Sequence, residues 1–120
     1  MKVLIVESNP ALGRLWQAHV ERTAGAQVAL TCSHDAAIQA ILCEAWDVIV
    51  LNLVLDDGGA MSVSDYAGFR QPDAKVIIIN SSSFFSDGSI FNHLSNARAI
   101  LPTSTRPEDL AAMVAHYGET

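Results

Sequence analysis

The stretch Trp46-Asp47-Val48-Ile49-Val50-Leu51-Asn52 holds four aliphatic residues in a row between an aspartate and an asparagine. Short, continuous apolar runs of this kind are typical of strands that are buried on both faces of a parallel sheet. Two further runs, at residues 3–6 and 75–80, repeat the pattern and also lead into polar residues. Residues 27–32 and 99–101 are weaker strand candidates. The sequence therefore predicts five strands.

Apolar residues at helical spacing occupy the intervals between the expected strands. In chain order they are Leu12, Leu15, Trp16 and Val20; Ile38, Ile41, Leu42 and Ala45; Ile90, Phe91 and Leu94; and Leu110, Met113, Val114 and Tyr117. Asn9 is the expected N-cap of the first helix, and Gly25 is expected just past its end. Thr105 and Glu108 match a capping box before the last helix. Residues 60–69 are the weakest helix candidate because they contain two serines and a glycine.

The expected strands and helices alternate along the whole chain. Parallel strands need helical crossovers, and right-handed crossovers place helices on both faces of the sheet. We therefore expect an α/β fold with three layers, doubly wound, in which a five-stranded parallel sheet has the order 2-1-3-4-5. No linker, repeat or low-complexity tail divides the chain, so residues 1–120 are expected to form a single domain.

The composition excludes several classes of function. The chain has 120 residues, 50% of them hydrophobic, and a net charge of −6 without any Lys/Arg run, so direct binding of nucleic acid is not expected. No apolar stretch reaches the roughly 18 residues that span a membrane, and no signal peptide opens the chain. We therefore expect a cytoplasmic protein. Cys32 and Cys43 lie in apolar segments and are expected to be buried, reduced thiols.

The carboxyl ends of the strands are where a doubly wound sheet binds its ligands. The residues expected at this edge are Glu7, Ser8, Asn52, Leu53, Asn80, Ser81 and residues 102–104. Several of these stretches resemble the receiver domains of response regulators, the CheY-like group with a flavodoxin-like fold. The resemblance rests on residues 3–9, VLIVESN; 46–52, WDVIVLN; 53–59, LVLDDGG; 96–104, NARAILPTS; and 107–110, PEDL. It implies a role in two-component, phosphorelay signal transduction.

The functional side chains depart from the receiver pattern. The acidic pair that holds Mg²⁺ in receivers corresponds to Glu7 and Ser8, and the acceptor aspartate corresponds to Asn52. The switch Ser/Thr corresponds to Asn80, with Ser81 beside it, and the lysine corresponds to Thr103. The resemblance therefore implies a degenerate site, as in an atypical pseudo-receiver.

These departures remove the chemistry of aspartyl phosphorylation. Forming an acyl phosphate needs a carboxylate nucleophile, and the amide of Asn52 is neutral. Mg²⁺ prefers carboxylate ligands, so Glu7 alone is expected to bind it weakly or not at all. No cofactor and no catalytic residue is expected, and the protein is not expected to be an enzyme. Asp56 and Asp57 are the nearby acids that would serve as a displaced acceptor, although their sequence is also that of an ordinary turn.

Without phosphorylation, the function would depend on surfaces that bind proteins. Five large apolar residues lie within about a dozen positions, and a single short helix is not expected to bury all of them. Exposed apolar patches often mark protein interfaces. The five residues are Phe84, Phe85, Ile90, Phe91 and Leu94. We expect binding of a signalling partner or homodimerisation through the face that they form with the last strand and the last helix. Two alternatives stay open: a sensor of small polar ligands that uses the strand-end crevice, and a phosphorelay receiver with a non-standard acceptor.

Overall fold

A computed structural model describes residues 1–53, 55, 59–80 and 97–119. Its strands are β1 (Lys2–Val6), β2 (Gln27–Thr31), β3 (Val48–Asn52), β4 (Lys75–Asn80) and β5 (Ala97–Pro102). All neighbouring strands are parallel, and the sheet order is β2-β1-β3-β4-β5. The predicted fold class and strand order are therefore confirmed.

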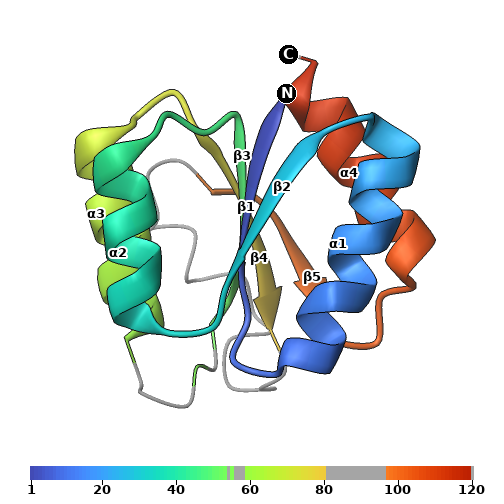
Figure 1. The fold of residues 1–120 in the computed structure, drawn as a ribbon, viewed down its shortest axis with the longest axis horizontal. Coiled ribbons are helices and arrows are strands. Elements are labelled where there is room, and N and C mark those ends of the chain that lie inside the picture. Colours follow the sequence, from blue (N-terminus) through green and yellow to red (C-terminus); the bar gives the residue numbers. More distant parts are fainter. Residues whose placement is uncertain (54, 56–58, 81–96, 120) are drawn as a thin grey trace.

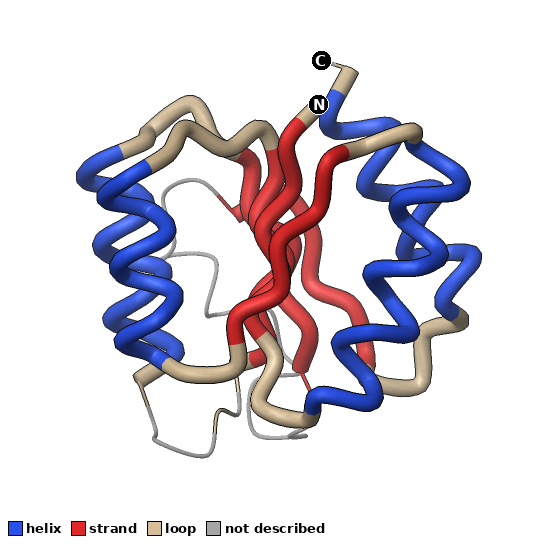
Figure 2. Tube along the Cα trace, viewed as in Figure 1, coloured by secondary structure: helices blue, strands red, loops and turns tan. Residues whose placement is uncertain are grey.

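In the described part of the chain, four helices cover the two faces of the sheet (Figures 1 and 2). They are α1 (Pro10–Ala24), α2 (His34–Cys43), α3 (Ala60–Arg70) and α4 (Pro107–Gly118). Helices α1 and α4 lie against one face, and α2 and α3 lie against the other. The weakest candidate, residues 60–69, is helical as predicted. The short helix expected around Ile90 to Leu94 lies outside the described residues. None of the described helices is long and apolar enough to cross a membrane.

The buried strands explain the absence of polar alternation in the sequence. Successive side chains of a strand point to opposite faces, and here both faces are covered by helices. The side chains that pack with α2 and α3 are Leu4, Val6, Ile49, Leu51, Val76 and Ile78. Those that pack with α1 and α4 are Val3, Ile5, Val48, Val50, Ile77 and Ile79. The central strands are thereby fixed in register, which sets the position of every residue at their carboxyl ends.

The first helix begins and ends as its sequence predicts. The Asn9 Oδ1 atom accepts hydrogen bonds from the backbone N–H groups of Ala11 (3.0 Å) and Leu12 (3.3 Å). Gly25 ends the helix with φ of 61°, in the left-handed region that glycine adopts without a steric penalty. The cap at Asn9 matters for the site because Asn9 also contacts Glu7.

The last helix begins differently from the prediction. Arg106 is its N-cap residue and makes no side-chain capping bond, and Pro107 takes the first helical position. This shift places Glu108 too early for a capping box with Thr105, so that prediction is wrong. Glu108 instead accepts hydrogen bonds from Arg106 Nη2 (2.8 Å) and Nε (3.2 Å). Its own backbone N–H and Arg106 both lower the pKa of the Glu108 carboxyl.

Two predictions of burial are wrong. The sequence predicts that Leu15, Leu42 and Ala45 lie on the buried faces of their helices, but all three are exposed. The buried face of each helix is narrower than predicted and includes neighbours such as Trp16 and Ile41. Cys32 and Cys43 are free thiols and are exposed rather than buried. Cys32 comes directly after the last residue of β2, and Cys43 is the last residue of α2, so both lie where the packed layers end.

Candidate functional site

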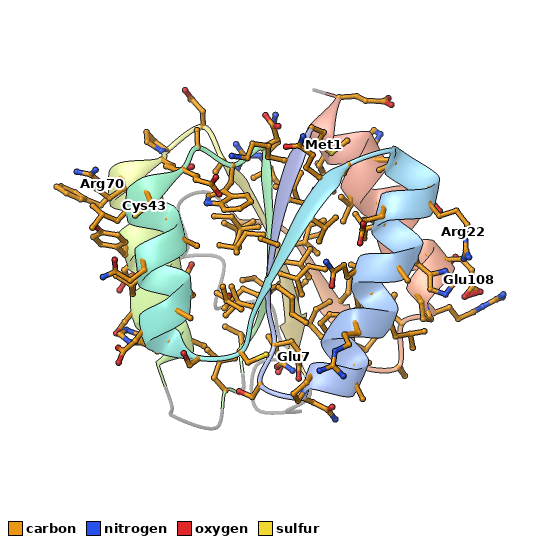
Figure 3. The ribbon with its side chains drawn as sticks, viewed as in Figure 1. Met1, Glu7, Arg22, Cys43, Arg70 and Glu108 are labelled. Atoms are coloured by element: carbon orange, nitrogen blue, oxygen red, sulfur yellow. The ribbon has the colours of Figure 1, made fainter. Side chains whose placement is uncertain are left out.

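Glu7 and Asn52 lie side by side at the carboxyl-terminal edge of the sheet. Val6 pairs with Leu51 in the parallel register of β1 and β3, so Glu7, directly after β1, lies next to Asn52, the last residue of β3. Their exposed fractions are only 4% and 5%. Figure 3 shows Glu7 at this edge, between the two helical layers. The prediction that Asn52 lies at the tip of the central strand agrees with this arrangement.

A hydrogen bond joins the two side chains directly. Asn52 Nδ2 donates to Glu7 Oε2 at 2.5 Å, and the backbone N–H of Asn9 donates to Glu7 Oε1 at 3.1 Å. Each carboxylate oxygen of Glu7 therefore accepts one hydrogen bond from a neutral donor. The Glu7 backbone is fixed as well, since its N–H donates to the Thr31 carbonyl at 3.0 Å. The orientation of the Asn52 amide follows from this network, because only its nitrogen can donate to a carboxylate.

Among the described residues, no basic side chain forms an ion pair with the buried carboxylate of Glu7. All seven Lys and Arg residues lie in the described part of the chain. The ion pairs found among the described residues involve Glu44, Asp35 and Glu108, but not Glu7. A buried charge needs hydrogen bonds or a counter-charge to be tolerated. Among the described residues, the amide of Asn52 and the N–H of Asn9 meet this need.

Three other predicted site residues at the carboxyl ends of the strands are Ser8, Asn80 and Thr103. Ser8 and Asn80 are half-buried, and Asn80 ends β4 opposite Pro102 of β5. Thr103 follows β5, and its hydroxyl is buried without a hydrogen-bond partner in the described part of the chain. The backbone N–H of Leu53 donates to the Ile79 carbonyl at 2.9 Å, which holds the exit from β3 against β4.

Several predicted site residues lie outside the described residues. They are Ser81, Asp56, Asp57 and the five apolar residues Phe84, Phe85, Ile90, Phe91 and Leu94. Among the residues that are described, no group of three or more His, Cys, Asp or Glu side chains could hold a metal ion. The site that the structure supports consists of Glu7 and Asn52, with Asn9 as a third member. Sequence reasoning identified Asn9 only as a helix cap, and nothing in the spacing signalled its bond to Glu7.

No protein-family model matches this chain, and no curated protein matches it by sequence. Solved structures match along nearly its whole length. A CheY-like response regulator receiver domain protein from Methanospirillum hungatei has a TM-score of 0.88 and 17% identity, covering 98% of this chain and 93% of its own. A two-component response regulator from Clostridium difficile has a TM-score of 0.84 and 22% identity, with coverages of 98% and 94%.

A third match is a response regulator solved in complex with ligands. The response regulator TrrA from Thermotoga maritima, in complex with Mg²⁺ and beryllium fluoride, has a TM-score of 0.82 and 16% identity; 97% of each chain is covered. The fold of this chain is therefore that of the CheY-like receiver domains, as the resemblance implied. At these levels of identity the likeness establishes the fold, whereas the chemistry of the crevice depends on this chain's own residues.

Proposed function

We propose that this chain is a receiver-like module of a two-component signalling pathway that acts through protein contacts and without aspartyl phosphorylation. The observation that carries the proposal is the hydrogen bond from Asn52 Nδ2 to Glu7 Oε2. The fold supplies the receiver scaffold, and this bond occupies the point of the scaffold where a receiver would carry out phosphorylation.

The side chain at position 52 lacks the nucleophile. Attack on a phosphoryl donor requires a carboxylate oxygen with negative charge. The Asn52 amide is neutral, and its nitrogen is directed at Glu7. Thr103, at the position that the resemblance assigns to the lysine, also brings no positive charge to stabilise a transferring phosphoryl group.

The donor set of the crevice does not fit a divalent cation. Mg²⁺ needs hard oxygen ligands in octahedral geometry, and it gives up its waters reluctantly. Glu7 is the one carboxylate of the described crevice, and a neighbouring N–H donates to each of its oxygens. A cation beside Glu7 Oε2 would have to displace the Asn52 amide group, whose N–H donor would otherwise point at the cation. Metal-assisted phosphoryl transfer is therefore not part of the proposed function.

A module without this chemistry needs another way to transmit a signal. A two-state equilibrium shifts only when an input binds the two states with different affinity. With residue 52 held by Glu7, the module would remain in one conformation until a partner binds it. This predicts constitutive binding of a signalling partner rather than binding that follows phosphorylation.

The test is incubation of the purified chain with Mg²⁺ and acetyl phosphate, followed by intact-mass analysis. We expect no phosphoryl adduct, while a receiver domain with an acceptor aspartate, treated in parallel, becomes modified. The variants Asp56→Asn and Asp57→Asn, taken through the same protocol, check the neighbouring carboxylates as displaced acceptors. A stoichiometric adduct on the unaltered chain, at whichever residue, would overturn the proposal.

A further inference from the structure

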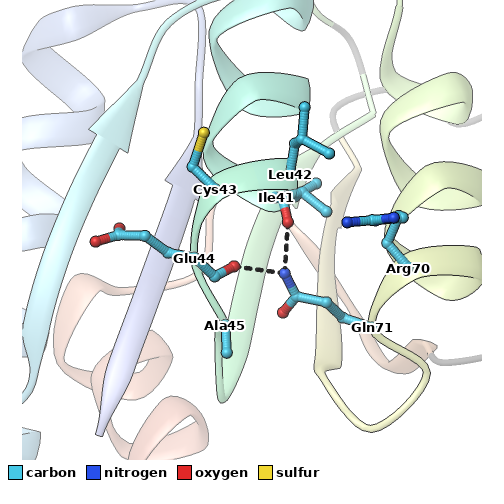
Figure 4. A pocket seen from close by; sticks show the side chains of 7 residues that line it. All are labelled: Ile41, Leu42, Cys43, Glu44, Ala45, Arg70 and Gln71. Carbon is cyan, nitrogen blue, oxygen red and sulfur yellow. Dashed lines mark hydrogen bonds between the residues drawn. The ribbon is translucent and has the colours of Figure 1, made fainter.

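The outer face of α2 and α3 combines exposed apolar side chains with a hollow. Phe69 is 81% exposed and Leu42 is 45% exposed. Between the carboxyl ends of the two helices lies a hollow of about 260 Å³ (Figure 4). The residues that line it are Ile41, Leu42, Cys43, Glu44, Ala45, Arg70 and Gln71. We call this region the α2–α3 face.

Phe69 has no role in the core of this domain. Helix α3 packs against the sheet through Ala60, Val63 and Ala67. Phe69 lies two residues after Ala67, about 200° around the helix, and so points away from the sheet. A largely exposed phenylalanine on the same pair of helices as an exposed leucine and a hollow is a combination found at protein interfaces, where aromatic and arginine side chains supply much of the binding energy.

Opposite charges stand at the two ends of the hollow. Arg70 is exposed and makes no ion pair among the described residues. Glu44, on the far side of Gln71 in Figure 4, is 52% exposed and pairs with Lys2 at 3.2 Å. A two-fold axis through the hollow would bring Arg70 of each copy next to Glu44 of the other, so that the dimer contains two such ion pairs. A two-fold contact requires a self-complementary surface of this kind.

We propose that the α2–α3 face is the contact surface of a two-fold homodimer, in which Phe69 of each copy packs against Leu42 and the hollow of the other. Because the chain carries a net charge of −6, two copies repel each other unless the contact brings opposite charges together. The paired Arg70 and Glu44 meet that requirement. The inference is independent of the proposal about residue 52.

The size of the face predicts a weak dimer. Two adjacent helices of 10 and 11 residues present a flat area of about 15 by 20 Å, or ~300 Å². Stable dimers bury roughly 800 Å² per partner. We therefore expect a weak dimer that is visible only at high protein concentration.

Sedimentation velocity over a wide concentration range tests the proposal. The unaltered chain is expected to shift toward dimer as its concentration rises, and Phe69→Ser is expected to weaken the association at least about tenfold, as loss of a hot-spot aromatic does. Leu15→Ser is the control for loss of an exposed apolar side chain elsewhere, since Leu15 lies on α1 and is as exposed as Leu42, at 45%. The control is expected to dimerise like the unaltered chain.

A charge exchange tests the two-fold geometry itself. Arg70→Glu and Glu44→Arg should each weaken the dimer by placing like charges together, and the double variant should restore it. Circular dichroism checks that each variant is folded. A chain that stays monomeric at every concentration, or a dimer that Phe69→Ser and both charge variants leave unchanged, would overturn the proposal.

Discussion

Asn52→Asp is expected to lower the free energy of unfolding at pH 7 by about 2–4 kcal/mol, although the two side chains have the same shape. The substitution replaces the donor 2.5 Å from Glu7 Oε2 with a second carboxylate oxygen. It removes a charge-assisted hydrogen bond and brings two negative charges together in a buried site. Urea or thermal unfolding of both proteins measures the difference.

The loss should depend on pH in a defined direction. Two adjacent carboxylates retain one shared proton up to a higher pH in the folded variant than in its unfolded chain. The raised pKa of the pair therefore stabilises the folded variant at low pH, and this stability is lost as the pH rises through that pKa. The deficit of Asn52→Asp should be largest above that raised pKa and shrink steadily as the pH falls toward about 4, the ordinary pKa of carboxyl groups in the unfolded chain.

The exchanged pair Glu7→Gln with Asn52→Asp is the matched control. A glutamine at position 7 would accept the Asn9 N–H through Oε1 and donate to the new aspartate through Nε2. The double variant should regain more than half of the stability that Asn52→Asp loses. If Asn52→Asp were as stable as the unaltered chain at pH 7, the arrangement of donors and acceptors described for this site would be wrong.

Gln71→Glu is expected to destabilise the protein by about 2–4 kcal/mol, because Gln71 connects α2, α3 and the entry to β3. Its Nε2 atom donates to the carbonyls of Ile41 (2.7 Å) and Glu44 (2.6 Å), and its Oε1 atom accepts from the Trp46 N–H (2.8 Å). A carboxylate keeps the acceptor but loses both donors and repels the two carbonyls. Buried or half-buried groups left without partners account for losses of this size.

Gln39→Glu is the control for the same chemical change at an exposed position. Gln39 lies on α2, and no hydrogen bond of its side chain is found among the described residues. Its substitution should change the unfolding free energy by less than about 0.5 kcal/mol. Equal effects of the two substitutions in chemical denaturation would refute the connecting role of Gln71.

The sequence predicts the sheet well because the strand signal is local. Residues such as Val48 to Leu51 are apolar on both faces, and only a doubly covered parallel sheet buries them all. The position of Asn52 follows directly, since it is the first polar residue after that run. The edge of the sheet where Glu7 and Asn52 meet is thus an inference from topology alone.

The features that sequence reasoning missed all depend on distant contacts. Gln71 is a polar residue in a turn, and its three side-chain hydrogen bonds reach residues that are 25 to 30 positions away. The exposure of Cys43 and Leu42 depends on where α2 ends relative to the sheet. The bond between Asn52 and Glu7 spans 45 positions, and only the register of β1 against β3 brings the two residues together.

The most direct test of the central claim is the Mg²⁺ dependence of the thermal unfolding midpoint, measured for the unaltered chain and for Asn52→Asp. A ligand that binds only the folded state raises its stability by mass action. If the Asn52 amide fills the place of a cation beside Glu7, added Mg²⁺ should leave the midpoint of the unaltered chain unchanged and raise that of the variant. An equal rise in both proteins would contradict the claim.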